Sequence, residues 1–204
     1  LPMILINGAL GIGTGFATSI PCYNPKQILH IIKNKIKDND LRMEYNEEIF
    51  PYYRGFKGTI TQIETHKYIT TGCYHVKDKN TFVITELPIG VWNDSYLVFL
   101  EKCIDQKKFK IKDYKDLSTD KDVRIELQFG SDTNLKDEKT IHSIITNFKC
   151  TSSLSTSNMY LFNKDEILTK YESANDIINS FIETRMEFYE KRKQAQITHL
   201  ESLL

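Results

Sequence analysis

Four stretches of the chain have the apolar spacing of an amphipathic helix. They are residues 25–37, 92–104, 136–148 and the chain from residue 173 to its end. The first stretch begins at Asn24-Pro25, which is typical of a helix start because Asn caps free N–H groups and Pro fits the first helical position. The pattern therefore predicts four helices, the last of which contains neither Pro nor Gly.

Short β-rich runs occupy much of the remaining chain. Residues 58–60, 68–70 and 81–85 are separated by clusters of Gly, Asn, Lys and Asp, which favours a meander between residues 53 and 85. Residues 123–127 alternate between apolar and polar side chains, and residues 159–162 indicate another strand. The apolar run 1–6 is expected to be buried.

The last predicted helix carries an apolar seam. Its members follow a 4-3 spacing, interrupted by Lys193 and Gln196, and are Ile182, Met186, Tyr189, Leu200 and Leu203. Long helices with such a seam need a partner, so the pattern predicts the first arm of a coiled coil. Both chain ends stop within a pattern, which predicts an internal piece of a longer protein.

Composition narrows the classes of function. The 204 residues include 27 basic and 27 acidic side chains, so the net charge is zero and an anionic partner must be held by local patches. No run approaches the roughly 18 to 20 apolar residues of a membrane span. The four cysteines lack metal-site spacing, which excludes a recognisable zinc finger and favours free thiols in a reducing compartment.

Residues 7–15 contain four glycines and invite a phosphate-loop interpretation. A Walker A loop needs Lys where Thr14 stands, and the run Gly11 to Gly15 is one residue too short for a dinucleotide fingerprint. A tight turn against buried backbone is the plainer alternative. Ile12, with glycines on both sides, is also compatible with a thin backbone ridge that enters a narrow space.

Candidate catalytic and metal residues are few. The five histidines share no ligand spacing, and no G-x-S-x-G motif occurs. The acidic clusters at residues 38–40 and 120–122 fit turns better than a magnesium site. Residues 149–158 place a lysine before a row of small hydroxyl side chains, which are groups that position phosphate oxygens, although the spacing alone favours a solvated loop.

Taken in order, four blocks of the chain resemble the type IIA DNA topoisomerases, nearest the eukaryotic and large-DNA-virus branch. They are NGALGIGTG with IPCYNP behind it (residues 7–15 and 20–25), YRGFKGTI (53–60), ITELP followed by Trp92 (84–88), and RMEFYEKRK (185–193). The blocks span nearly the whole chain. One departure is Leu10, which stands where the eukaryotic enzymes usually have an acidic residue.

This resemblance implies an α+β fold. It would consist of a shoulder or connector segment over residues 1–28, a mixed-sheet tower domain with flanking helices over 29–172, and the start of a coiled-coil arm to the C-gate over 173–204. The family passes one DNA duplex through a transient double-strand break in another, using ATP and Mg²⁺. Its nucleophilic tyrosine follows an arginine, and no Arg-Tyr pair occurs here. The nucleophile, the metal ligands and the ATPase are therefore expected outside this chain, which alone would be inactive.

The resemblance also implies DNA contacts. Ile12 matches the isoleucine that the family wedges between base pairs, and Trp92 matches a tower tryptophan that lies against DNA, with a core position as its rival. Further contacts are implied for Arg54 and Lys57 and, along one segment, for Lys149, Thr151, Ser152, Ser153, Thr156, Ser157 and Asn158. The implied partners are double-stranded DNA and a second copy of the chain, without a membrane.

Two other classes of function remain open on the sequence. One is a non-catalytic coiled-coil assembly module with an α/β head, and the other is a small nucleotide-binding enzyme. The location would be the nucleus in a cellular source or the host cytoplasm for a large DNA virus. Usage rich in Lys, Asn, Ile and Tyr suggests an AT-rich genome and favours the viral, cytoplasmic alternative.

Overall fold

The computed structural model describes residues 1–37 and 48–203, so the acidic cluster predicted as a turn at 38–40 lies outside the described residues. The chain divides into two compact units. The first contains residues 1–53 and 155–204, and the second contains residues 54–154. This division does not follow the boundaries 1–28, 29–172 and 173–204, because the chain returns to its first unit after residue 154.

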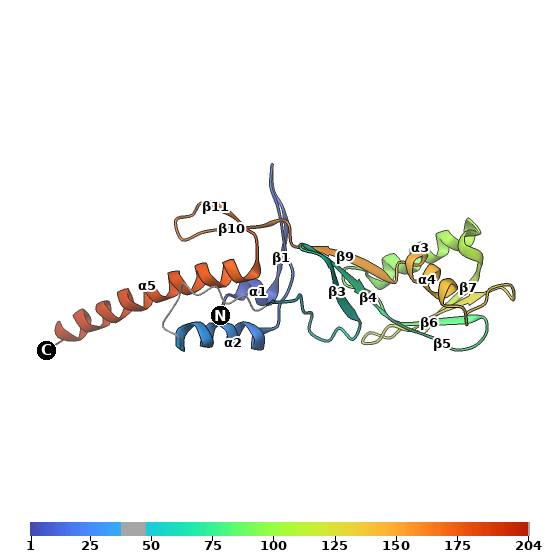
Figure 1. Ribbon diagram of the computed structural model, residues 1–204, viewed down its shortest axis with the longest axis horizontal. Helices are drawn as coiled ribbons and strands as arrows, with labels where there is room; N and C mark the ends of the chain where they lie inside the picture. Colours follow the sequence, from blue (N-terminus) through green and yellow to red (C-terminus); the bar gives the residue numbers. More distant parts are fainter. Residues whose placement is uncertain (38–47, 204) are drawn as a thin grey trace. The chain divides into compact units, whose positions relative to one another are not determined.

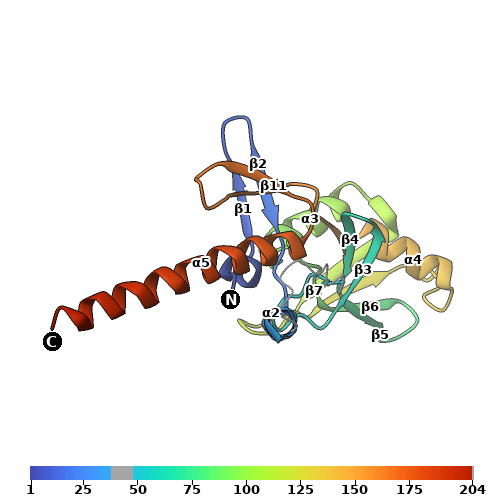
Figure 2. The ribbon, with the colours of Figure 1, turned by 60° about the vertical axis from the view of Figure 1, so that its left-hand side comes forward.

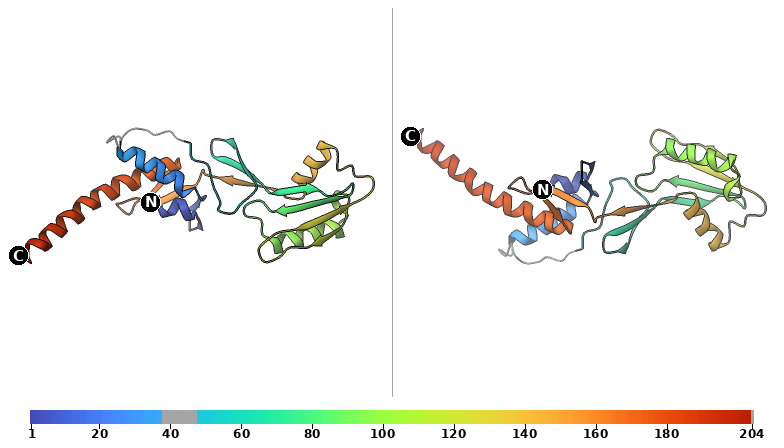
Figure 3. Two further views of the ribbon diagram at one scale, coloured as in Figure 1. Left: turned by 90° about the horizontal axis from the view of Figure 1, so that it is seen from below. Right: turned by 90° about the horizontal axis from the view of Figure 1, so that it is seen from above.

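The first unit combines helices with two hairpins (Figure 1). Its elements are α1 (Met3–Asn7), β1 (Ala9–Ile12), β2 (Ala17–Ile20), α2 (Pro25–Lys37), β10 (Met159–Phe162), β11 (Leu168–Tyr171) and α5 (Ala174–Glu201). Strands β1 and β2 pair antiparallel, as do β10 and β11. Helix α2 lies alongside the first half of α5 (Figure 3).

The core of this unit lies between the helices and the bases of the hairpins. It is formed by Leu5, Ile20, Tyr23, Ile28, Ile31, Met159, Tyr171, Ala174, Ile177, Ile178 and Ile182. Helix α5 begins at a capping box, in which Ser173 and Asp176 each accept the other's backbone N–H. Beyond Ile182 the apolar seam is uncovered, since Met186, Tyr189 and Leu200 are exposed.

The second unit contains two sheets and two helices. A three-stranded sheet has the order β3-β4-β9, and a four-stranded sheet has the order β5-β6-β8-β7. The strands are β3 (Thr59–Glu64), β4 (Lys67–Thr71), β5 (Cys73–Val76), β6 (Thr81–Glu86), β7 (Ile111–Asp116), β8 (Ile125–Phe129) and β9 (Thr151–Ser155). Helices α3 (Asn93–Asp105) and α4 (Glu138–Asn147) and the short 3₁₀ helix η1 (Lys108–Lys110) complete it.

Helices α3 and α4 pack on one face of the four-stranded sheet (Figure 1). Alternate residues of β6 and β8 point toward them, namely Phe82, Ile84, Ile125, Leu127 and Phe129, and meet Tyr96, Leu100, Cys103 and Ile144. The buried Tyr96 hydroxyl donates to the carbonyl of Phe148 at 2.7 Å. This bond ties α3 to the residue that ends α4.

The four predicted helices are confirmed, and the α+β class with them. One sequence interpretation was wrong and one holds only in part. The hydroxyl-rich stretch forms strand β9 rather than a solvated loop, because it pairs with β4. The apolar run 1–6 is buried at Pro2 and Leu5, the latter within the short helix α1, whereas Leu1 and Met3 are exposed. Within the described ranges, no helix is both long enough and apolar enough to cross a lipid bilayer.

Candidate nucleic-acid interface

The glycine-rich segment forms the β1–β2 hairpin. Its loop closes with a hydrogen bond from the N–H of Gly13 to the carbonyl of Phe16 at 2.8 Å. Gly8, at its base, has φ +69° and a Cβ there would lie 2.8 Å from the carbonyl oxygen of Ile20. A phosphate loop requires a turn that opens a helix, so the hairpin contradicts the nucleotide-binding interpretation of these glycines.

Ile12 is the last residue of β1 and is 92% exposed. A shallow groove of about 390 Å³ runs beside it, with an almost wholly apolar lining that includes Phe16, Tyr160 and Phe162. Phe16 and Phe162 are themselves exposed. Sequence reasoning missed both aromatic residues. The signal for Phe16 was its position directly after the glycine run, whereas Phe162 reaches this place only through folding.

Trp92 precedes the first turn of α3 and is 78% exposed. The alternative in which the single tryptophan belongs to the core is therefore wrong. Arg54 and Lys57 are exposed as well. These three residues belong to the second unit, whereas Ile12 belongs to the first, so each group is described separately.

Two of the blocks that carry the family resemblance meet within the second unit. The backbone N–H of Lys57 donates to the Glu86 carboxylate at 2.8 Å. Next to it, a Cβ on Gly58 would lie only 2.1 Å from the carbonyl oxygen of Thr71, so this position needs glycine. The Lys57–Glu86 hydrogen bond and the close approach of Gly58 to Thr71 join the start of β3 to β4 and β6. The side chain of Lys57 stays at the surface.

The segment 149–158 presents only part of its polar surface. Lys149 is exposed, with its ammonium 4.4 Å from the centre of the Phe99 ring. Of the predicted contacts after it, Ser153, Ser157 and Asn158 are exposed, as is Ser155, while Thr151 and Ser152 are half-buried. Thr156 is buried with 5% of its surface exposed, which contradicts its predicted contact through the side chain.

The thiols of the chain are not activated. Burial raises the pKa of Cys150 to about 12, and it also raises the pKa values of Cys22, Cys73 and Cys103. Thiolates are the nucleophilic form, so these groups stay protonated and weakly reactive near neutral pH. Among residues 1–37 and 48–203, no three His, Cys, Asp or Glu side chains are grouped as a metal would require.

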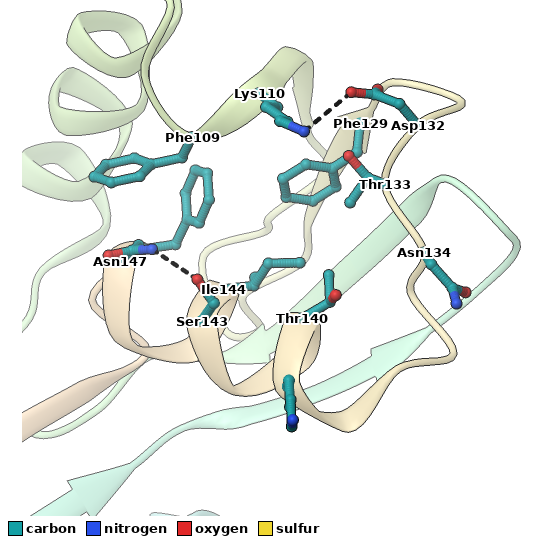
Figure 4. Close-up of a pocket in the computed structure, with 12 residues that line it drawn as sticks. Phe109, Lys110, Phe129, Asp132, Thr133, Asn134, Thr140, Ser143, Ile144 and Asn147 are labelled. Atoms are coloured by element: carbon teal, nitrogen blue, oxygen red, sulfur yellow. Dashed lines mark hydrogen bonds and ion pairs between the residues drawn. The ribbon is translucent and has the colours of Figure 1, made fainter.

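A second pocket, of about 510 Å³, lies in the second unit between η1, the end of β8 and α4 (Figure 4). The rings of Phe109, Phe129 and Phe148 line it, and an ion pair of 3.2 Å joins Lys110 to Asp132 at its rim. None of the residues implied by the resemblance lines this pocket. The candidate interface is therefore the exposed set described above.

Comparison with known proteins decides the family. The family model for the A subunit of DNA gyrase/topoisomerase IV matches residues 1–204. The chain belongs to the type IIA DNA topoisomerases. Relatives of this topoisomerase chain include DNA topoisomerase 2 of Arabidopsis thaliana, 35% identical over 98% of the chain, and that of Penicillium chrysogenum, 35% identical over 100% of the chain. The crystal structure of the Plasmodium falciparum topoisomerase II DNA-binding, cleavage and re-ligation domain is 35% identical over 98% of this chain, with a TM-score of 0.86.

The topoisomerase chain is short beside these proteins. It spans 14% and 12% of the two curated relatives and 27% of the Plasmodium chain. The family and the α+β fold predicted from the four sequence blocks are confirmed. The relatives named are proteins of cellular eukaryotes, and they give no support to the preference for a viral, cytoplasmic source.

Proposed function

We propose that this chain is part of an ATP-dependent type II DNA topoisomerase, in which it binds and bends the duplex that is to be cut. The observation that carries the proposal is Ile12, a large apolar side chain 92% exposed at the end of a narrow hairpin. Burial of such a side chain is favourable, so a site that holds it in water is well suited to insertion into another molecule.

Insertion between base pairs explains the geometry of the hairpin. An apolar wedge unstacks one base step at a cost of a few kcal/mol and kinks the duplex, which then contacts more protein surface. Pyrimidine–purine steps kink most easily, so the protein would prefer certain sequences without hydrogen bonds to their bases. The neighbouring Phe16 and Phe162 extend the apolar surface available to the displaced bases.

The polar residues would hold the DNA backbone. Cations and hydroxyl groups contact phosphates without reading the sequence. The polar residues available for this role are Arg54, Lys57, Lys149, Thr151, Ser152, Ser153, Ser157 and Asn158. We leave Thr156 out of this set because its side chain is buried. The exposed Trp92 would instead lie against the DNA.

For the whole protein we propose a homodimer that uses ATP and Mg²⁺ and acts in the nucleus. The described part of this chain groups no three His, Cys, Asp or Glu side chains, so the metal would be held elsewhere. The nucleophilic tyrosine and the ATPase would also lie elsewhere, since the family's tyrosine follows an arginine and no Arg-Tyr pair occurs in these 204 residues. The exposed seam on α5 would form the first arm of a coiled coil that leads to the C-gate of the dimer, since exposed Met186, Tyr189 and Leu200 need a cover. The chain alone would not cleave DNA.

The test is binding of the full-length protein to a duplex of about 30 base pairs, a length over which a protein-induced kink is measurable, with an energy-transfer pair on its ends. Binding that weakens with salt and brings the ends together supports the proposal. Binding without approach of the ends contradicts the bending role.

The exposed seam of α5 also favours a second candidate, a coiled-coil assembly module. Such a module would dimerise through α5 and ignore DNA at every salt concentration. Failure to bind the duplex at low salt, together with a dimer in sedimentation, would establish this alternative and remove all the DNA contacts.

A further inference from the structure

The hairpin that carries Ile12 is a two-stranded sheet, and such a hairpin is marginally stable by itself. The hairpin of β10 and β11 lies beside it (Figure 2), and β10 contacts its second strand, β2. The Thr18 hydroxyl donates to the carbonyl of Tyr160 at 2.9 Å and accepts from the N–H of the same residue at 3.2 Å. One position further along β2, the N–H of Ser19 donates to the carbonyl of Asn158 at 2.8 Å.

Thr18 lies one register position from the exposed Ile12, whose direct partner is Ala17. Thr18 is paired with Gly11, the neighbour of Ile12, and its methyl group would be 3.8 Å from a Cβ at Gly11. A second contact supports the same side of the hairpin, where the rings of Phe16 and Tyr160 meet edge to face with centres 5.8 Å apart. Tyr160 therefore receives both contacts from the returning half of the hairpin.

Strand β10 can hold the β1–β2 hairpin in place because it is itself anchored in the core of its unit. Met159 is fully buried. The hydroxyl of Tyr171, on the paired strand β11, lies 3.3 Å from the Ser180 hydroxyl on α5. A continuous series of contacts thus runs from Gly11 through Thr18 to β10, β11 and α5.

We propose that Thr18 is a positioning residue for the Ile12 wedge. This inference rests on the proposed function of the chain. Stacked bases resist insertion, and a hairpin that tilts freely would lay Ile12 along the groove instead of between the bases. The Thr18 hydroxyl uses both its donor and its acceptor on one backbone residue, which fixes the hairpin against that tilt.

The variants separate the hydroxyl group from the shape of the side chain. Thr18→Val keeps the shape and removes both hydrogen bonds, whereas Thr18→Ser keeps the hydroxyl. Thr169→Val is the matched control, because its hydroxyl donates only to the carbonyl of Ile167, two residues away. Bending by the full-length protein is measured by energy transfer on two duplexes, one fully paired and one with a mismatch at the kinked step. That step is located first with 2-aminopurine, whose fluorescence rises when it is unstacked.

We expect Thr18→Val to lower the ratio of bent to unbent complex about ten-fold on the paired duplex, the size expected for hydrogen bonds of ordinary strength. On the mismatched duplex, where the step is already unstacked, the loss should nearly vanish. Thr18→Ser and Thr169→Val should bend both duplexes as the wild type does. A role confined to folding would lower bending equally on both.

Three results would overturn the inference. Equal loss on the two duplexes would assign Thr18 to folding or general binding. If Thr18→Val bends DNA normally while Ile12→Ala does not, Ile12 would keep its role as the wedge and Thr18 would have no role in positioning it. Normal bending by Ile12→Ala would remove the wedge itself. If Thr18→Val does not fold, Phe16→Leu tests the second contact on the same two duplexes. It keeps an apolar side chain for the displaced bases and removes only the ring contact with Tyr160, so a loss is expected on the paired duplex alone.

Discussion

Replacing Ile12 with alanine separates the stability of the fold from the bending of DNA. Because the side chain is 92% exposed, its removal should change the free energy of unfolding by less than about 0.5 kcal/mol. In the bent complex the same side chain would be buried between bases. Alanine lacks three of its carbon atoms, each worth about 0.8 kcal/mol on burial, for a total of about 2.4 kcal/mol. That loss corresponds to a roughly 50-fold lower ratio of bent to unbent complex.

Two measurements on the full-length protein check this prediction. Thermal unfolding should give the same melting temperature for Ile12→Ala and the wild type, and energy transfer across the end-labelled duplex should fall. The control is Ile167→Ala, which makes the same chemical change at another exposed hairpin position and should bend DNA normally. Refutation would be a lower melting temperature with unchanged bending, since Ile12 would then stabilise the fold and not the kink.

Three further substitutions or treatments test the chain more broadly. Lys149→Ala should weaken binding to all DNA sequences. It should also reduce the slope of log K against log salt concentration by about the amount expected for one phosphate contact, and an unchanged slope would show that Lys149 does not contact a phosphate. Tyr96→Phe leaves the buried carbonyl of Phe148 with only the weak thiol donor of Cys150 at 3.8 Å, so unfolding should cost about 1 kcal/mol less by thermal or chemical denaturation. Cys150, whose pKa is raised to about 12 by burial, should resist alkylation near neutral pH until the protein unfolds; rapid labelling of the native protein would contradict its burial.

The helices were predictable because their signals are local. Asn24 accepts the N–H of Lys26 at 2.9 Å, which is the cap expected from the Asn-Pro pair. Ser173 likewise begins α5 where the pattern placed it. Apolar residues repeated every three or four positions then fix the buried face of each helix, as Ile28 and Ile31 do in α2.

The pairing of the strands and the division into two units depend on residues far apart in the chain, and the sequence does not show which segments will meet. Residues 151–155 have the composition of a loop, yet the Thr70 hydroxyl donates to the Ser152 carbonyl at 3.3 Å across the β4–β9 pair. The exposure of Trp92 is equally invisible in the sequence, since a lone tryptophan fits a core as well as a surface. Periodicity describes which face of an element is apolar, but not which neighbour covers it.

The segment 149–158 shows how folding narrows a candidate interface. The carbonyl groups of Ser152 and Asn158 are occupied by Thr70 and Ser19, and the side chain of Thr156 is buried. What faces solvent is the ammonium of Lys149 and the side chains of Ser153, Ser155, Ser157 and Asn158. The row of hydroxyl groups therefore serves two purposes, because its buried members support the strands while its exposed members remain available to phosphates. A substitution at Thr156 should act through stability, and a substitution at Ser153 through DNA binding alone.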